Sequence, residues 1–222
     1  MVLLIVNVLI FIAFGYLVIL PLGKFKNSIE NDEKLKIIGS LEFKSLAESY
    51  NEIYEIKAQT ARSLLKKAEY DSLTGILNRR AFDQICESSA EKKQKIALLL
   101  IDMDNFKSVN DTYGHIGGDN ALKSLAMALS ETFRDTDYVA RVGGDEFAAI
   151  LPNCEPSAAN GIKKKIDRIN KRLSQLEEHF VSISVGVAFS DCGFSKELYD
   201  RADKALYAVK EKGKRGCEVY QF

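Results

Sequence analysis

The first twenty residues of the chain carry almost only apolar side chains. Val2 to Leu20 has no charged residue, and the first charge along the chain is Lys24. A helix over this run is about 28 Å long at ~1.5 Å per residue, close to the thickness of a hydrocarbon core. Lys24 and Lys26 follow it, and the positive-inside bias then puts the rest of the chain in the cytoplasm. The pattern predicts a single-pass transmembrane helix over residues 1–23, in the inner (cytoplasmic) membrane, rather than a cleaved signal peptide, which has a basic start and a small-residue cleavage site.

A charged, helix-prone segment follows over residues 24–68, with Gly39-Ser40 as its only evident break. Within it, seven positions follow the alternating three-and-four spacing of a coiled-coil seam: Phe43, Leu46, Tyr50, Ile53, Lys57, Thr60 and Leu64. Polar residues at two core positions, Lys57 and Thr60, weaken the seam. A solvated amphipathic helix is the alternative. We favour a dimerising signalling helix, because this segment joins a membrane anchor to a folded domain.

The pattern changes at about residue 69 to alternating helices and strands, which continue to the end of the chain. Asn78 can cap a helix to about Lys92, and the apolar run Ile96–Ile101 suits a central strand covered on both faces. The later elements are a helix after Gly117-Gly118, strands at Tyr138–Val142 and Phe147–Leu151 forming a hairpin, a helix to about Glu178, a strand at Val181–Phe189, a helix through Leu198 and Val209, and an edge strand at Cys217–Tyr220. We therefore predict an α+β domain over residues 69–222, with a central, mostly antiparallel sheet and packed helices.

Charge and cysteine usage narrow the classes of partner. Lys plus Arg and Asp plus Glu each number 31, so the net charge is zero and no basic excess draws the chain to nucleic acid. The four cysteines are far apart and lack metal-ligand spacing. These features predict a reduced, cytosolic domain that does not bind nucleic acid.

Four acidic residues fall at the ends of predicted strands. Asp102 and Asp104 end the most buried strand, and Asp145-Glu146 follow Gly143-Gly144 at the hairpin tip. Crowded carboxylates repel one another, so this placement indicates a divalent cation, with chance surface acids as the alternative. A calcium loop starting at Asp102 is rejected because Phe106 falls at a ligand position. Neither a Walker loop nor a G-x-G-x-x-G fingerprint is present, and paired glycines alone indicate only a turn.

Six ordered motifs together resemble the GGDEF family of diguanylate cyclases over about residues 69–221. They are Asp71-Ser72-Leu73-Thr74-Gly75 with Asn78-Arg79-Arg80; Asp102-Met103-Asp104-Asn105-Phe106-Lys107 with Asn110-Asp111; Gly114-His115 with Gly118-Asp119; Arg141-Val142-Gly143-Gly144-Asp145-Glu146-Phe147; Ser184-Val185-Gly186-Val187-Ala188; and Ala202-Asp203-Lys204-Ala205-Leu206-Tyr207 with Lys210. One departure is Arg215 after Gly213-Lys214, where the family usually has Asn. Upstream, Pro21-Leu22 and Glu42 to Asn51 resemble the two ends of a HAMP signalling module, with a shorter segment between them.

The resemblance implies a palm-like nucleotide-cyclase fold that condenses two GTP into cyclic di-GMP and releases two pyrophosphates. It assigns catalysis to Glu146, as general base for the 3′-hydroxyl, and to Asp145. It assigns Mg²⁺ or Mn²⁺, two ions per active half-site, to Asp102, the Met103 carbonyl and Asp145. A non-catalytic domain that binds GTP or cyclic di-GMP is the alternative, although such domains usually lack one of these acids.

The same resemblance implies the residues that bind nucleotide, and the role of Asp104 is left open. Asn110 and Asp119 would read guanine; the other substrate residues would be Phe106, Lys107, Gly143, Gly144, Lys210 and Lys214, with Phe106 and Lys107 offering backbone amides to phosphates. Arg134 and Asp137 match the family's R-x-x-D product-inhibition site, so cyclic di-GMP is expected as product and inhibitor. Taken singly, Asn110 could close a turn, Lys210 could be a solvated side chain, and Arg134-Asp137 could be a surface ion pair. The symmetry of the product implies a homodimer.

Overall fold

The computed structural model describes residues 1–175 and 181–221, and residues 61–67 by their backbone alone. The chain divides into two compact units, Met1–Leu65 and Lys66–Phe222, which are described separately here. Two predicted features, the seam side chain of Leu64 and the end of a helix near Glu178, lie outside the described residues.

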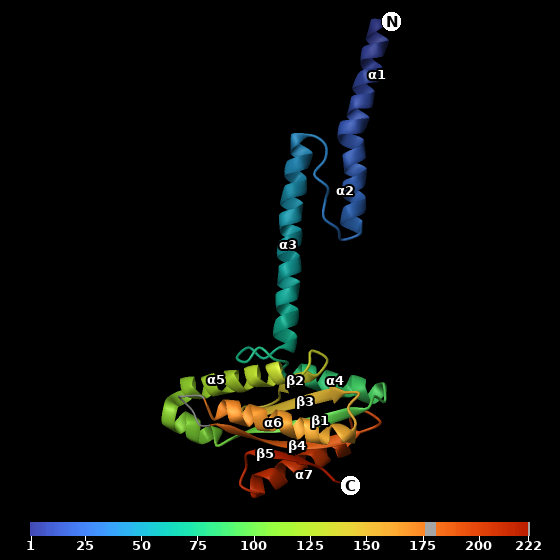
Figure 1. The fold of residues 1–222 in the computed structure, drawn as a ribbon. Helices are drawn as coiled ribbons and strands as arrows, with labels where there is room; N and C mark the ends of the chain where they lie inside the picture. Colours follow the sequence, from blue (N-terminus) through green and yellow to red (C-terminus); the bar gives the residue numbers. More distant parts are fainter. Residues whose placement is uncertain (176–180, 222) are drawn as a thin grey trace. The chain divides into compact units, whose positions relative to one another are not determined.

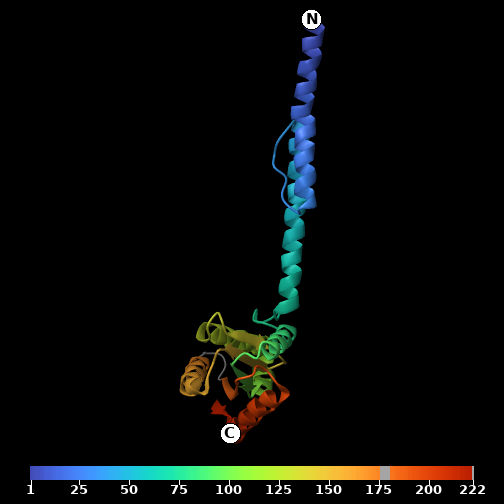
Figure 2. The ribbon, with the colours of Figure 1, turned by 90° about the vertical axis from the view of Figure 1, so that its right-hand side faces the viewer.

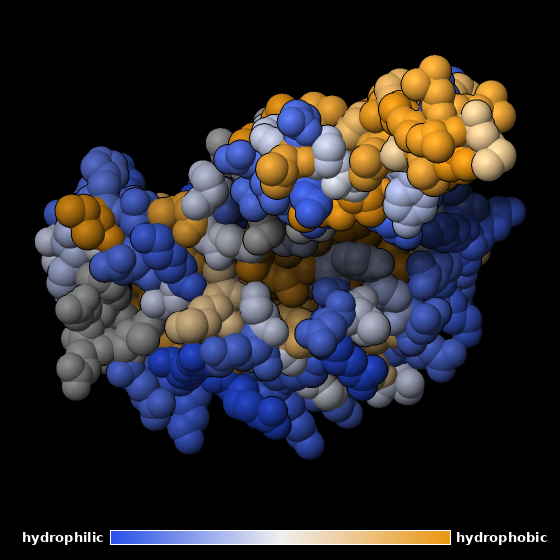
Figure 3. Space-filling view, turned by 90° about the horizontal axis from the view of Figure 1, so that it is seen from above, coloured by the Kyte–Doolittle hydropathy of each residue, from blue (hydrophilic) through white to orange (hydrophobic). Residues whose placement is uncertain are grey.

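The first unit begins with a continuous helix, Val2–Glu30, that is long and apolar enough to cross a membrane. It comprises α1 (Val2–Phe14), one π-helical turn η1 (Gly15–Ile19) and α2 (Leu20–Glu30). The apolar side chains of α1 are exposed and form an orange surface in the space-filling view (Figure 3). The apolar run stops near residue 21, as the sequence indicates. The helix continues beyond it to Glu30.

A connecting segment returns the chain so that α3 (Leu41–Glu69) lies beside α2 in the same direction (Figures 1 and 2). The predicted break at Gly39-Ser40 is therefore only the end of a longer break that starts at Asn31. The reason is local packing: Leu35 of the connector is buried, and the Asn51 side chain binds its backbone N–H (2.7 Å) and carbonyl (2.9 Å). These two hydrogen bonds satisfy the Leu35 N–H and carbonyl, which in a helix would bond to other backbone groups.

Some side chains of the predicted coiled-coil seam of α3 are packed within the unit, and others are exposed. Phe43 and Tyr50 pack against the small core of Phe25, Leu35 and Ala47, whereas Leu46 and Ile53 are 55% and 64% exposed. Lys57 is paired with Asp32 at 3.2 Å within the same unit. Part of the seam therefore packs within one chain, and part presents apolar side chains at its surface.

The second unit is built on a five-stranded sheet with the order β2-β3-β1-β4-β5. The strands are β1 (Ile96–Asp104), β2 (Tyr138–Arg141), β3 (Glu146–Pro152), β4 (Ser182–Ser190) and β5 (Gly216–Val219). Among the strands that the structure describes, the β4–β5 pair is parallel and the other pairs are antiparallel, and β1 is central, between β3 and β4. The predicted α+β class and mostly antiparallel sheet are confirmed.

Helices cover both faces of the sheet (Figure 1). The helices are α4 (Arg79–Glu91), α5 (Phe106–Thr132), α6 (Ala159–Leu173), preceded by the short 3₁₀ turn η2 (Pro156–Ala158), and α7 (Lys196–Glu211). Along β1, odd-numbered residues from 97 to 103 join the core under α5 and α6, and even-numbered residues from 96 to 100 join the core under α4 and α7. Asp102 and Asp104 continue the even series, so the strand period directs both carboxylates to the α4 and α7 face.

Local sequence signals explain the ends of these helices. The Asn78 side chain accepts from the Ala81 N–H at 3.0 Å and caps α4, as predicted. The helix expected after Gly117-Gly118 starts earlier, at Phe106, and changes direction at Gly114, whose φ of +71° suits glycine. The chain therefore turns between Asn110 and Asp119, the two residues that the sequence predicts to bind guanine.

Gly186 of β4 provides a test of how α7 sits on the sheet. A Cβ at this position would lie 2.1 Å from the Ala202 carbonyl oxygen and 2.2 Å from the Leu206 nitrogen, both in the backbone of α7. We expect Gly186→Ala to lower the free energy of unfolding by about 3 kcal/mol, because the helix must move away from the strand. Urea unfolding of a fragment beginning at Lys66 measures this. Gly161→Ala, where no atom lies within 4 Å of the added Cβ, is the matched control and should be neutral or stabilising; equal loss in both variants would contradict the packing.

Candidate functional site

The site lies at the end of β1, where two antiparallel neighbours bring polar residues beside it. Asp102 is opposite Glu146 in the β1–β3 pair and opposite Ser184 in the β1–β4 pair. Side chains of directly opposed residues share a face about 5 Å apart. The Met103 N–H donates to the Asp145 carbonyl at 3.1 Å, which joins the strand to the hairpin tip. The fold thus brings together the predicted residues Asp102, Met103, Asp145 and Glu146.

The hairpin tip is held by its own backbone and by Arg141. The N–H groups of Val142 and Gly143 both donate to the Glu146 carbonyl, at 2.9 and 3.2 Å. The Arg141 guanidinium donates to the Gly144 carbonyl at 2.8 Å and to Asp71 at 3.1 Å. A Cβ on Gly143 would lie 3.2 Å from the Glu146 Cβ and closer still to its carboxylate, so glycine leaves room for that side chain. Arg141 and Asp71 are supports that sequence reasoning included in motifs but did not assign to the site.

Burial and neighbouring charges both act on the carboxylate of Asp102. Its side chain is 16% exposed and lies 2.8 Å from the Lys210 ammonium. Burial raises the pKa of Asp102, and the charges of Asp145 and Asp104 raise it further, while Lys210 opposes the rise. The net direction is upward, so one lysine does not fully offset burial and repulsion. An additional positive charge near Asp102 and Asp145 would relieve both.

Asp104 has different partners from Asp102 although both point to the same face. It is 3% exposed, and it accepts hydrogen bonds from the hydroxyls of Ser182 (2.6 Å) and Ser184 (2.7 Å) and from the Arg215 N–H (3.1 Å). Sequence reasoning included Ser184 in a motif without giving it a role, and did not single out Ser182. Their polarity at alternate positions of an otherwise apolar strand was the available signal.

The residues predicted to read a base lie around the bend in α5. The Asn110 side chain lies against Gly118, where an added Cβ would be 2.0 Å from Asn110 Oδ1 and 3.2 Å from the Phe106 ring. Gly118 therefore brings the two arms of the bend together, and the next residue, Asp119, is exposed beside them. Lys107 is exposed in the first turn of the same helix.

The second predicted cation of the site, Lys214, lies in the loop between α7 and β5. Its ammonium donates to Asn105 Oδ1 at 2.6 Å, at the residue that precedes α5. Lys210 and Lys214 therefore lie beside the end of β1 and the start of α5. Lys210 is paired with the Asp102 carboxylate and is not simply a solvated side chain.

Arg134 and Asp137 form a tight turn between α5 and β2, away from the end of β1. The Asp137 carboxylate accepts from the Arg134 N–H at 2.9 Å, and the Asp137 N–H donates to the Arg134 carbonyl at 2.8 Å. Both residues line two neighbouring hollows of about 410 and 440 Å³. The guanidinium is on an exposed residue and can reach a ligand in either hollow.

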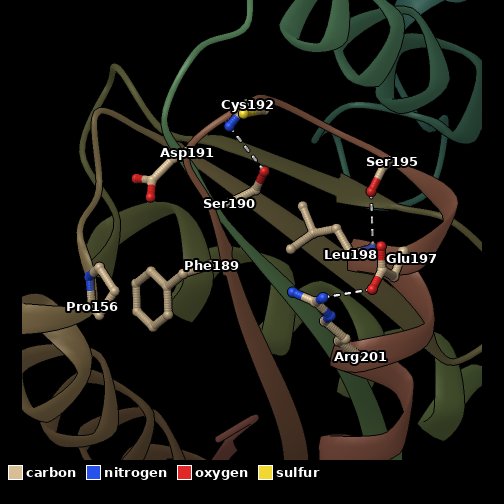
Figure 4. Close-up of a pocket in the computed structure, with 9 residues that line it drawn as sticks. All are labelled: Pro156, Phe189, Ser190, Asp191, Cys192, Ser195, Glu197, Leu198 and Arg201. Atoms are coloured by element: carbon tan, nitrogen blue, oxygen red, sulfur yellow. Dashed lines mark hydrogen bonds and ion pairs between the residues drawn. The ribbon is translucent and has the colours of Figure 1, made fainter. Parts of the chain in front are cut away.

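Another cavity, of about 270 Å³, lies at the opposite end of the sheet (Figure 4). Its lining includes Ser190, which is opposite Ile96 at the start of β1, and Arg201, which is paired with Glu197. None of the predicted site residues lines this cavity. The chemistry indicated by the sequence is therefore not located there.

The donor set at the end of β1 fits a divalent cation that brings further ligands with it. Within residues 1–175 and 181–221, no group of three or more His, Cys, Asp or Glu side chains is arranged to hold a metal ion. Asp102 and the Met103 carbonyl of β1, together with Asp145 of the hairpin tip, offer hard oxygen donors. Mg²⁺ is commonly held by one or two carboxylates together with substrate phosphates. Two carboxylates and a carbonyl fit that mode of binding.

Comparison with known proteins identifies the family of the second unit. The family described as diguanylate cyclase, GGDEF domain, matches residues 68–216. Diguanylate cyclase DgcS of Shewanella oneidensis is 33% identical over 167 residues, which cover 73% of this chain and 56% of that protein. Diguanylate cyclase A of Treponema denticola is 36% identical over 132 residues, covering 57% and 36%. The chain thus spans about half or less of the length of these relatives.

A solved structure shows the same fold. The coiled coil and GGDEF domain of DgcB from Caulobacter crescentus, in complex with c-di-GMP, has a TM-score of 0.65 and 27% identity, covering 79% of this chain and 97% of that one. The predicted palm-like fold is thereby confirmed. The match over residues 68–216 also contains every site residue that the motifs indicated. On these grounds the chain belongs to the GGDEF domain family.

Proposed function

We propose that this chain is a diguanylate cyclase, which condenses two GTP into cyclic di-GMP and releases two pyrophosphates. The observation that carries the proposal is the convergence of Asp102, Asp145 and Glu146 at the end of β1. The likeness to diguanylate cyclases supports it. The alternative is a non-catalytic GTP- or cyclic di-GMP-binding domain, and the intact acidic set argues against it.

In the proposed reaction, the 3′-hydroxyl of each GTP attacks the α-phosphorus of the other. Each attack forms a P–O bond, breaks the bond to the β-phosphate and releases pyrophosphate. Glu146 is exposed at the hairpin tip and would accept the proton of the hydroxyl. Asp102, Asp145 and the Met103 carbonyl would hold Mg²⁺ or Mn²⁺, two ions per half-site, which when bound would lower the pKa of the hydroxyl and screen the phosphates.

Recognition of GTP is proposed for the residues around the start of α5 and the end of α7. Asn110 and Asp119 would bind the guanine edge, since a carboxylate accepts from N1 and N2 hydrogens that adenine lacks. The backbone amides of Phe106 and Lys107 would face the β- and γ-phosphates. Gly143 and Gly144 would let the substrate approach the hairpin backbone. The cations Lys210 and Lys214 would also face the phosphates, with Lys210 exchanging Asp102 for phosphate.

The location and organisation of the chain follow as part of the same proposal. Residues 1–23 would form a single-pass anchor in the cytoplasmic membrane, residues 24–68 a helical signalling linker, and residues 69–222 the cyclase domain in the cytoplasm. The apolar helix and the cations Lys24 and Lys26 support this orientation. The compact unit that begins at Lys66 supports the last boundary.

Replacing Glu146 tests the catalytic assignment. Glu146→Gln should reduce cyclic di-GMP formation at least 100-fold while GTP binding changes less than about threefold, because the amide keeps the shape but accepts no proton. Product formed from GTP and Mg²⁺ is measured by chromatography, and binding by calorimetry with 3′-deoxy-GTP. Glu87→Gln, an exposed residue of α4, is the control and should retain activity. Wild-type turnover in a folded Glu146→Gln protein would refute the assignment.

Arg134→Ala tests product inhibition by cyclic di-GMP at the Arg134–Asp137 turn. The turn itself is held by the Asp137 carboxylate and two backbone N–H groups, so removing the guanidinium preserves its shape. We expect the concentration of cyclic di-GMP that halves the initial rate to rise at least tenfold, since a bidentate contact is lost. Superimposable inhibition curves for the variant and the wild type would show that product does not act through Arg134.

The symmetry of the product predicts a dimer as the active species. One domain offers one GTP site, yet two bonds form between two nucleotides, so two domains must face each other. A fragment from Lys66 should show specific activity that rises with protein concentration. A fragment from Lys24 should be more active at low concentration, because the linker raises the effective concentration of the second domain. Ile53→Glu, at an exposed apolar position of α3, should remove that advantage; concentration-independent activity of a monomer would contradict the dimer.

A further inference from the structure

The loop between α7 and β5 has an unusual backbone. Gly213, Lys214 and Arg215 have φ values of +102°, +68° and +53°, so three successive residues lie in the left-handed region. Glycine adopts this region freely, whereas a residue with a Cβ is destabilised there by contact of the Cβ with the backbone. Asn tolerates the left-handed region better than Arg does. The structure around the loop must therefore stabilise Lys214 and Arg215 in this conformation.

Asp104 supplies a fixed acceptor for this loop. The carboxylate is buried, and two of its three hydrogen-bond donors are hydroxyls of β4, on Ser182 and Ser184. The third donor is the Arg215 N–H, 3.1 Å from Oδ2. Because the serines belong to the central sheet, their hydrogen bonds hold the Asp104 carboxylate in place independently of the loop.

The loop in turn places a cation at the start of α5. The Lys214 N–H donates to the Val209 carbonyl at 3.0 Å, which closes the end of α7, and its ammonium donates to Asn105 at 2.6 Å. Asn105 directly follows Asp104 and precedes the first turn of α5. One buried carboxylate therefore connects β1, β4 and the loop that carries Lys214.

We propose that Asp104 is a positioning residue for the triphosphate: by binding the Arg215 N–H it holds the left-handed loop so that Lys214 faces the nucleotide phosphates. The inference rests on the proposed function, because it takes GTP as the ligand. Asp104 does not touch the substrate in this account. Its three hydrogen bonds distinguish it from Asp102, which has a lysine as its partner and is proposed as a metal ligand.

The test uses the full chain in detergent micelles and two readouts that need no turnover. The first is binding of 3′-deoxy-GTP with Mg²⁺, because this nucleotide lacks the attacking hydroxyl. The second is hydrogen exchange of the amides of residues 213–217. Asp104→Asn replaces a charged acceptor by a neutral one, and Asp167→Asn, at an exposed residue of α6, is the matched control.

We expect Asp104→Asn to speed amide exchange at Arg215 and to weaken 3′-deoxy-GTP binding about fivefold, because the competent loop is less populated. The double variant Asp104→Asn with Lys214→Met should weaken binding by less than the product of the two single fold-changes, since Asp104 acts through Lys214. Arg215→Gly, which removes the Cβ at a left-handed position, should restore much of the binding in the Asp104→Asn background. The Asp167→Asn control should match the wild type in both readouts.

Three results would overturn the proposal. Unchanged exchange at Arg215 would show that Asp104 does not hold the loop, and faster exchange with unchanged binding would show that the loop does not serve the phosphates. A higher Mg²⁺ requirement with unchanged exchange would make Asp104 a metal ligand instead. If wild-type protein fails to bind 3′-deoxy-GTP, the proposed function itself fails, and this outcome is separate because it is seen before any substitution.

Discussion

The crowding of carboxylates at the end of β1 constrains the whole of the second unit. Asp102 and Asp104 leave the same face of a strand buried between two neighbours, and the hairpin brings Asp145 and Glu146 to the same end. Like charges at this spacing destabilise a fold unless each has a partner. Lys210 of α7 pairs with Asp102, and Ser182 and Ser184 of β4 donate to Asp104, so α7 and β4 both contribute to stabilising the two aspartates.

The two aspartates of β1 are stabilised in different ways, and the difference fits the roles proposed for them. Asp104 is surrounded by donors of the protein itself and needs no ligand. Among the residues that the structure describes, Lys210 is the one ion-pair partner of Asp102. The pKa of Asp102 is raised chiefly by burial. A carboxylate in that condition is costly to ionise and is stabilised by a bound cation. Protein stability is thus reduced at the position where substrate and metal are proposed to bind.

The sequence predicts the fold well where one local signal decides the structure, and less well where tertiary contacts decide it. The apolar run at Ile96, the Asn78 cap and the paired glycines of the hairpin each act within a few residues, and the elements they predict are present. The connector after Glu30 was underestimated because Asn51, sixteen residues beyond Leu35, holds it. The bend of α5 at Gly114 and the hydrogen bonds of Ser182 and Ser184 to Asp104 were likewise not predicted, since the serines come from a distant segment of the chain. The proposed site residues were indicated by motifs, in which a short stretch of sequence reflects contacts between distant segments.

The stability of Asp102→Asn, measured against pH and Mg²⁺ on a fragment from Lys66, tests the central claim most directly. Because burial raises the folded-state pKa of Asp102, its ionised form destabilises the fold above that pKa, and protonation removes the penalty below it. Without metal, the variant should therefore be more stable than wild type at pH 7.5, and the difference should shrink as the pH falls through that pKa and vanish below the ordinary aspartate pKa of 3.8. Millimolar Mg²⁺ with 3′-deoxy-GTP should then stabilise the wild type alone. A variant that is less stable at pH 7.5, or that gains equally from Mg²⁺ and nucleotide, would contradict the account.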